Sequence, residues 1–221
     1  MELMSKKSPS TKGIDQVDML YYINLDKRED RLLYLESNVL PYIDLPSNKK
    51  TRVSAVDHTN FSHISQRGAG CSLSHIKVWK DAIDKGYTRI IVMEDDFTLL
   101  EEKDDFNRVI QDLNTIEFSI CNLGYNNRSP LIETNDKGFY RCTNIQTTSC
   151  YVADVRFLKL MLPHIEEATA RLMNCESYHA NAIDQVWKKF QTRKDWLVSK
   201  RVGKQRASHS DIEKRNTNYG V

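Results

Sequence analysis

Arg89-Ile90-Ile91-Val92-Met93-Glu94-Asp95-Asp96 is the stretch of sequence from which the fold can be worked out. Large apolar residues, most of them β-branched, run up to three consecutive carboxylates. Such a run, bounded by polar residues, predicts a strand buried on both faces in the middle of a parallel sheet. Open α/β sheets bind their ligands at the carboxyl ends of the strands, and the three acids lie at that end.

The spacing of the three acids indicates a metal site. Side chains two apart on a strand point the same way, so Glu94 and Asp96 are expected to share a face and Asp95 to point away from it. Two carboxylates on one face suit Mg²⁺ or Mn²⁺, which completes its coordination with phosphate and water. The alternative is that the acids end the strand and begin a solvated loop, because four more acids follow between positions 101 and 105.

Composition indicates one soluble domain. Of the 221 residues, 40% are hydrophobic and 28% charged, which allows a core and a polar surface. We expect a flexible leader at 1–17, a single domain at 18–213 and a short tail at 214–221. The net charge of +2 is too balanced, and the basic residues are too dispersed, to indicate a nucleic-acid partner.

The sequence also predicts a cytoplasmic location. It contains no apolar run long enough for a transmembrane segment, and its first residues are too polar for a signal peptide. The five cysteines show neither paired metal spacing nor a CxxC motif, so we interpret them as reduced packing residues.

Hydrophobic patterning predicts an alternating first half. The expected elements are strands at 19–25, 51–56 and 89–94, a helix after Asp26, and a helix from about Ser72 to Lys85. Asp26 and Glu29 have capping-box spacing, and Gly68-Ala69-Gly70 is expected in the loop before the second helix. This order predicts a right-handed α/β unit.

The second half is less regular. The expected elements are strands at 118–123, 139–142, 145–153 and 196–198, and helices at 155–162 and 176–191. We expect the strands at 139–142 and 145–153 to pair antiparallel. The helix that begins over 155–162 is expected to meet Pro163.

Basic residues next to the first strand are candidate anion ligands. Arg28 and Arg31 lie one turn apart at a helix start. The helix dipole favours anions at this position, so two arginines there are explained if they and the helix terminus bind a diphosphate together. Alternatively, they are surface arginines that balance nearby acids. Ser74 and His75 follow a glycine-rich stretch that matches no common phosphate loop. They are candidate donors to a ligand, although a lone histidine on a helix is more often structural.

Two later segments carry further candidates. Asp184 lies beside the apolar stripe of its expected helix, where a cleft would raise its pKa and suit a general base. Otherwise it is an ordinary carboxylate at the edge of the core. In the tail, Arg206 and Ser208 are candidate phosphate contacts and His209 a candidate metal ligand, unless this segment is simply solvated.

The order of these motifs resembles glycosyltransferase family 25, the lipooligosaccharide and collagen hydroxylysine galactosyltransferases. The two most specific matches are Gly70-Cys71-Ser72-Leu73-Ser74-His75 and Glu94-Asp95-Asp96, and the resemblance extends from residue 19 to 213. It implies a GT-A-like, Rossmann-type nucleotide-sugar-binding domain with a mixed, mainly parallel sheet flanked by helices. One departure is Gln66-Arg67-Gly68-Ala69, where the family often has an acid.

The resemblance also implies roles for individual residues. A UDP-hexose donor and Mn²⁺ (or Mg²⁺) would be held by a DxD-like motif, with Asp96, Glu94 and His209 on the metal. The residues expected near the nucleotide are Arg28, Arg31, Asp57, Ser74, His75, Asp95, Arg206 and Ser208. Asp184 would take the proton of an acceptor hydroxyl.

The resemblance leaves the substrates partly open. The acceptor is expected to be a glycan, as in lipopolysaccharide biosynthesis, or a hydroxylysine-containing collagen-like protein, and the hexose galactose or glucose. Two other classes fit the same acids. One is a metal-dependent nucleotidyl- or phosphotransferase, which releases pyrophosphate in place of UDP. The other is a module that binds nucleotide sugars without turnover.

Overall fold

The computed structural model describes residues 16–100, 102 and 104–218. Most of the expected leader (1–17) and the end of the tail lie outside the described residues. The strands are β1 (Met19–Asn24), β2 (Lys50–Ser54), β3 (Arg89–Glu94), β4 (Phe97–Leu99), β5 (Ile120–Asn127), β6 (Ile132–Glu133), β7 (Phe139–Arg141), β8 (Ile145–Asp154), β9 (Trp196–Gln205), β10 (Ser208–Ser210) and β11 (Arg215–Thr217). The helices are α1 (Glu29–Asn38), α2 (Ile64–Asp84), α3 (Asp104–Asp112), α4 (Val155–Met173), α5 (Tyr178–Asn181) and α6 (Ile183–Val186), with short 3₁₀ turns between them.

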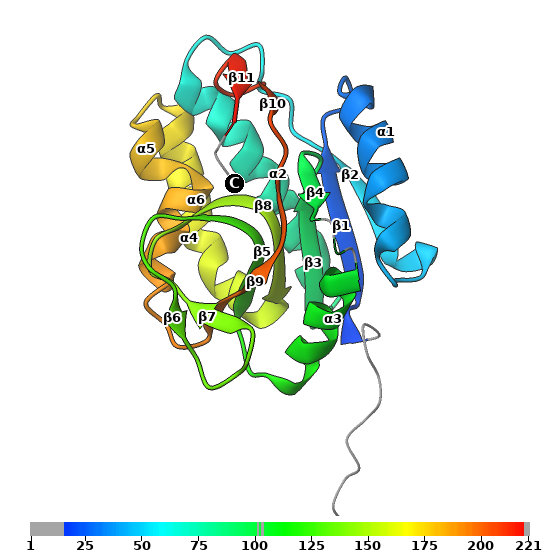
Figure 1. Ribbon diagram of the computed structural model, residues 1–221. Helices are drawn as coiled ribbons and strands as arrows, with labels where there is room; N and C mark the ends of the chain where they lie inside the picture. The colour runs from blue at the N-terminus through cyan, green and yellow to red at the C-terminus, as the bar shows by residue number, and fades with distance from the viewer. Residues whose placement is uncertain (1–15, 101, 103, 219–221) are drawn as a thin grey trace, which may run out of the picture.

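The described strands form a nine-stranded sheet with a separate β10–β11 hairpin (Figure 1). Its order is β2-β1-β3-β8-β5-β9-β7-β6, and β4 pairs with β9. β1 is parallel to β2 and β3, and β5 is parallel to β9, whereas β8 runs antiparallel between β3 and β5. The central strands thus share one direction except β8, which confirms the expected mixed, mainly parallel sheet.

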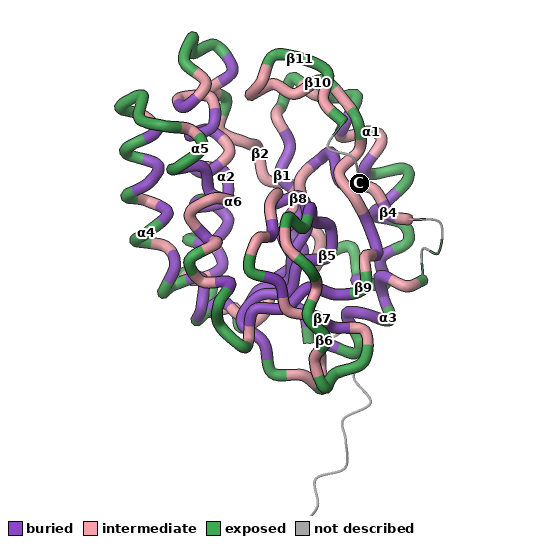
Figure 2. Tube along the Cα trace, turned by 60° about the vertical axis from the view of Figure 1, so that its left-hand side comes forward, coloured by how far each residue is buried: buried purple, intermediate pink, exposed green. Residues whose placement is uncertain are grey.

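The apolar run that predicted β3 is buried on both faces. Ile90, Ile91, Val92 and Met93 are all fully buried. Alternate residues of β3 enter two different cores, with α1 and α3 covering one face of the sheet and α2 and α4 the other. Figure 2 shows the buried residues concentrated along the central strands.

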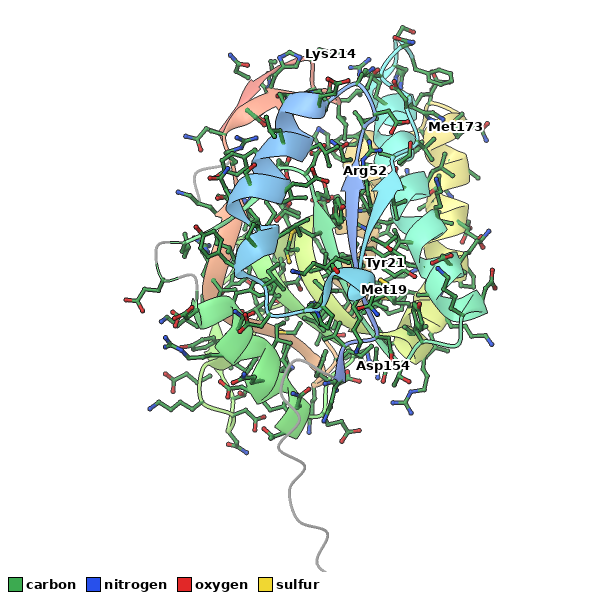
Figure 3. All side chains as sticks on the ribbon, turned by 90° about the vertical axis from the view of Figure 1, so that its right-hand side faces the viewer. Met19, Tyr21, Arg52, Asp154, Met173 and Lys214 are labelled. Atoms are coloured by element: carbon green, nitrogen blue, oxygen red, sulfur yellow. The ribbon has the colours of Figure 1, made fainter. Side chains whose placement is uncertain are left out.

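The C-terminal hairpin lies at the carboxyl end of the parallel strands. Figure 3 shows Lys214, between β10 and β11, at the same end of the sheet as Arg52 of β2. Met19, which begins β1, and Asp154, which ends the antiparallel β8, lie at the opposite end. The last described part of the chain therefore returns to the edge where the three acids are.

The expected start of α1 was wrong in detail. Arg28 is the N-cap residue and its side chain makes no capping hydrogen bond. The carboxylate of Asp26, which we expected to form a capping box, accepts hydrogen bonds from Arg52 and Ser54 of the neighbouring β2. Asp26 therefore accepts hydrogen bonds from residues of β2 and does not cap α1.

The glycine-rich stretch is helical, not a loop. α2 begins at Ile64, capped by His63, so residues 68–70 lie within its first turns. The expectation of a loop there was wrong because glycine serves packing at this position: a Cβ on Gly68 would overlap the ring of Tyr178 in α5. Glycine lowers the intrinsic helix propensity of this segment, but it allows a close contact between α2 and α5.

The second half differs most from expectation. α4 runs through Pro163 to Met173, and the expected helix at 176–191 is divided into α5, α6 and a 3₁₀ turn at 187–190. β7 pairs with β6 and β9 and not with β8. β9 continues from Trp196 to Gln205, well past the expected end at 198, and passes Phe97 of β4, whose ring occupies the space that a Cβ on Gly203 would need.

Two general expectations can be compared with the described chain. All five cysteines lie within it and are free thiols, with Cys121, Cys142 and Cys150 buried. None of its helices combines the length and the hydropathy needed to span a membrane.

Candidate active site

A cavity of about 140 Å³ opens at the carboxyl ends of β1 and β3. Its walls come from these strand ends, the segment before α2, α2 itself and the C-terminal hairpin. Glu94, Asp95 and Asp96 all line it, as the position of the acids in the sequence predicted.

Arg31 is a buried residue that lines this cavity and lies in direct contact with two of the acids. Its Nη1 is 2.9 Å from Oδ1 of Asp95 and 3.7 Å from Oδ2 of Asp96. Nη2 of Arg31 donates to the backbone oxygen of His209, at 2.7 Å. Asn24, the last residue of β1, donates to the other oxygen of Asp95 at 2.7 Å. Asp95 is thereby fully engaged in positioning Arg31 and the end of β1.

The expected orientation of the acids was wrong for Asp95. β3 ends at Glu94, so the alternation of side chains does not continue through the turn that follows. As a result, Asp95 and Asp96 both approach Arg31.

Asp96 is the least satisfied of the three acids. Its Oδ2 accepts a hydrogen bond of 2.8 Å from Nε2 of Gln205, but its Oδ1 is buried and has no hydrogen-bond partner among the described residues. Burial, together with the nearby charge of Glu94, raises the pKa of Asp96 to about 7. A bound cation would therefore stabilise the ionised form of this buried carboxylate.

Glu94 is held by two neighbours. Its Oε1 accepts a hydrogen bond from Thr148 and lies 3.3 Å from Nε2 of His75, whose Nδ1 is 2.9 Å from the hydroxyl of Tyr151. Burial raises the pKa of Glu94, but the hydrogen bonds from His75 and Thr148 outweigh it, and the pKa lies below its ordinary value. Glu94 is therefore an ionised carboxylate next to Asp96.

Cys71, His75 and Glu94 form a second group of candidate metal ligands. One ligand atom from each lies within 4.8 Å of the others. However, both ring nitrogens of His75 already have partners, and burial raises the pKa of the Cys71 thiol well above its ordinary value. The thiolate form that binds metals is thus disfavoured, and Asp96 fits a hard divalent cation better.

A second cavity, of about 260 Å³, adjoins the first and contains Asp184. Cys71, Glu94, Gln205 and Ile212 line both cavities and so form a common wall. Oδ2 of Asp184 accepts a hydrogen bond of 3.1 Å from the backbone N–H of Thr147. Burial raises the pKa of Asp184, as a general base requires.

Hydrogen bonds connect the two cavities through Gln205. Its Nε2 donates to Asp96, and its Oε1 accepts from Oγ1 of Thr147 at 3.2 Å. Thr147 in turn donates its N–H to Asp184. Thr147 has a φ of 69°, in the left-handed region that β-branched residues avoid. Strain of this kind costs about 1–3 kcal/mol and is concentrated at functional sites.

The structure brings together about half of the residues that the sequence singled out. Those lining the first cavity are Arg31, Ser74, His75, Glu94, Asp95 and Asp96. Ser74 has a structural task as well, because its Oγ accepts the backbone N–H of Val56 at 2.9 Å.

Asp184 lines the second cavity, and the remaining candidates line neither. Arg28 forms ion pairs with Asp30 and Asp211, and exposed Asp57 pairs with Lys27. The guanidinium of Arg206 stacks over the ring of Tyr34, with 3.7 Å from Cζ to the centroid. Oγ of Ser208 and the backbone oxygen of His209 accept hydrogen bonds from Arg31. His209 is an exposed residue.

Several residues of the site were missed from the sequence, among them Asn24, Gln205 and Thr147. Asn24 could have been found, because a buried amide at the end of a strand is unusual and β1 was expected there. Gln205 could not, because β9 was expected to end before it. Nothing in the residue type of Thr147 indicates a left-handed backbone.

The chain matches a known protein family and resembles solved structures. Residues 18–185 match the family described as glycosyltransferase family 25 (LPS biosynthesis protein). The chain is similar to a glycosyltransferase involved in the glycosylation of the major capsid of PBCV-1, with a TM-score of 0.52 and 8% identity over 89% of this chain and 96% of that one. It is also similar to mannose-1-phosphate geranyltransferase from Thermus thermophilus, with a TM-score of 0.47 and 12% identity over 89% and 76% of the two chains.

These likenesses carry different weight. At 8% identity, the likeness to the PBCV-1 enzyme concerns the fold alone, and it supports a GT-A-like architecture. The family match spans most of the sequence, including both acidic centres, Glu94-Asp95-Asp96 and Asp184. The protein therefore belongs to glycosyltransferase family 25.

Proposed function

We propose that this glycosyltransferase moves a hexose from UDP-hexose to an acceptor hydroxyl with the help of a divalent cation. The observation that carries the proposal is Asp96, a buried carboxylate at the carboxyl end of β3 with an unpartnered oxygen among the described residues. This is the edge of an α/β sheet where nucleotides bind.

The donor is proposed to occupy the first cavity. Cleavage of the glycosidic bond leaves negative charge on the diphosphate, which must be stabilised as it develops. Arg31 and Arg67 line this cavity, and Asp95 and Asn24 hold Arg31 and the strand end in place. We propose supporting roles for Ser74 and His75 on α2. Arg28 and Ser208 would act indirectly, through the hairpin that covers the site.

Mn²⁺ or Mg²⁺ fits this donor set through Asp96 with Glu94, and when bound it would neutralise charge on the departing diphosphate. His209 is not needed for this proposal, since its imidazole is exposed and lines neither cavity.

The acceptor is proposed to enter from the second cavity. Asp184 takes the proton of the acceptor hydroxyl while that oxygen attacks the anomeric carbon and the bond from this carbon to UDP breaks. The raised pKa of Asp184 and its hydrogen bond from Thr147 support this role. Attack from the side opposite the leaving group would invert the sugar.

A panel of UDP-sugars with and without Mn²⁺ tests the proposal. We expect UDP-galactose or UDP-glucose to raise the melting temperature only with the metal, and to release UDP when a glycan acceptor is added. Release of pyrophosphate in place of UDP would identify a nucleotidyltransferase. Binding without release of UDP, whatever acceptor is offered, would identify a non-catalytic module.

A further inference from the structure

We infer that the second cavity is an acceptor subsite for an uncharged hexose unit and that Asn126 binds one of its hydroxyl groups. The inference rests on the proposed function and goes beyond it. It assigns the acceptor to a neutral sugar and not to a hydroxylysine side chain, and it gives a role to a residue outside the three acids and Asp184.

Asn126 carries an unexplained buried atom. The residue lies near the end of β5, is 7% exposed and lines the second cavity. Its Oδ1 is buried without a hydrogen-bond partner among the described residues. Buried carbonyl oxygens are nearly always hydrogen-bonded, so this oxygen is explained by a donor that the protein itself does not supply.

The charges around the cavity argue against an anionic acceptor. No Lys or Arg is among the described residues that line it, and its carboxylates come from Glu94, Asp184 and Glu213. An anionic acceptor would be repelled there. Each of these carboxylates already has a donor in the structure: His75 and Thr148 for Glu94, Thr147 and Gln185 for Asp184, and Arg215 for Glu213.

The unpartnered atom, and not the charge of the lining, favours a hydroxyl group over a lysine-type ammonium. An ammonium would be drawn to the three carboxylates, each of which already has a donor, whereas the atom left without a partner is an amide oxygen, which accepts a hydrogen bond from a hydroxyl group. The rest of the lining is rich in amides and hydroxyls, which exchange hydrogen bonds with sugar hydroxyls. These residues are Gln146, Thr147, Thr148, Gln185 and Gln205.

One wall offers an apolar surface for the sugar ring. Tyr178 lines the cavity and packs directly on the backbone of α2 at Gly68, with the ring of His179 at 5.6 Å between centroids. Tyrosine combines an apolar face with a polar edge, as recognition of an amphipathic sugar requires. A hexose in this cavity would present one hydroxyl to Asp184 and another to Asn126.

Binding of simple glycosides to the UDP- and Mn²⁺-loaded protein tests the inference. The probes are methyl β-D-galactopyranoside and methyl β-D-glucopyranoside, and the charged competitors are methyl β-D-glucuronide and 5-hydroxylysine. Binding of each compound is measured by saturation-transfer NMR. We expect at least one neutral hexoside to bind and neither charged compound to displace it. Asn126→Leu should weaken hexoside binding about tenfold, because the accepting oxygen is lost.

Asn127→Leu is the matched control, since Asn127 is the exposed neighbour of Asn126 on the same strand and lines neither cavity. It should bind hexosides as the unaltered protein does. UDP affinity should be the same in all three proteins. Unchanged hexoside binding in Asn126→Leu would overturn the inference, as would binding of hydroxylysine in place of the hexosides.

The same experiment separates two failures. If the unaltered protein binds UDP and releases it with another acceptor, but no neutral hexoside binds, only the acceptor inference is overturned. If the unaltered protein does not bind UDP at all, the proposed function fails and the acceptor inference with it. Loss of UDP binding in Asn126→Leu would assign Asn126 a structural role and overturn the inference as well.

Discussion

The two cavities share a wall but differ in charge. The lining of the first contains the guanidinium groups of Arg31 and Arg67 and four carboxylates, those of Glu94, Asp95, Asp96 and Asp211. In the second, the described lining contains amides, hydroxyls and carboxylates and no Lys or Arg. In the proposed function the first would hold the charged leaving group and the second the neutral nucleophile, which are the two halves of a glycosyl transfer.

The difference teaches that the proposed charged and neutral partners would lie side by side, on either side of a wall that the two cavities share. Gln205 is neutral, lines both cavities and binds Asp96 with one end and Thr147 with the other. Changes confined to one cavity should therefore have separable effects, and a change at Gln205 should disturb both.

The largest effect is expected for Asp96→Ala. This change removes the unpartnered carboxylate of the first cavity, so transfer should fall below detection and UDP should no longer raise the melting temperature in a Mn²⁺-dependent way. Binding of methyl hexosides in the second cavity should persist. Asp112→Ala, at the exposed end of α3, is the control. Metal-dependent UDP binding retained by Asp96→Ala would place the cation elsewhere.

Asp184→Asn should show the opposite pattern. The amide keeps the shape of the side chain but cannot take a proton, so turnover should decrease by about 10²–10⁴. UDP affinity and its metal dependence should be unchanged, as measured by calorimetry. Asp84→Asn, on the exposed side of α2, should behave like the unaltered protein. Full turnover in Asp184→Asn would remove this residue from the mechanism.

Gln205→Leu is expected to disturb both cavities but to lower turnover less than the changes above. Asp96 and Thr147 would lose their common partner while the lining stays in place, so turnover should fall about 10²-fold or less through misplacement of the carboxylates. The pH profile of turnover should shift, since both Asp96 and Asp184 change surroundings. Lys204→Leu changes the preceding residue of β9, which lines neither cavity, and should leave the pH profile unaltered. An unaltered profile in Gln205→Leu would show that the cavities are independent.

The smallest effect concerns stability in the absence of divalent metal. Burial raises the pKa of Asp96 to about 7 from its usual 3.8, so between these values the folded protein binds a proton that the unfolded chain has lost. The free energy of unfolding should therefore fall as the pH rises from about 4 to 7, as measured by urea denaturation in EDTA. Asp96→Asn should flatten this part of the curve. An equal slope in both proteins would assign it to other groups.

The regular half of the molecule could be predicted from sequence, and the irregular half could not. β1, β2 and β3 follow from short apolar runs, and the position of Glu94-Asp95-Asp96 at a ligand-binding edge follows from β3. These are consequences of local pattern. The first cavity was accordingly anticipated in outline, although the directions of the acids depend on where β3 ends.

Long-range contacts explain the errors. Gly68 signals a loop by residue type but is helical because Tyr178 needs the space. The path of β9 to Gln205 and the left-handed Thr147 depend on neighbours far away in the sequence. The second cavity is built from such segments, so Asp184 was singled out as a candidate but its surroundings were not predicted.

Gly203 shows how far the demands of the site extend into the sheet. The ring of Phe97 fills the space beside this glycine, and Phe97 immediately follows Asp96 in the chain. A side chain at position 203 would push on that ring and so on the turn that carries the acids. Mutagenesis aimed at altering sugar preference should hence leave position 203 unvaried, although no substrate would ever touch it.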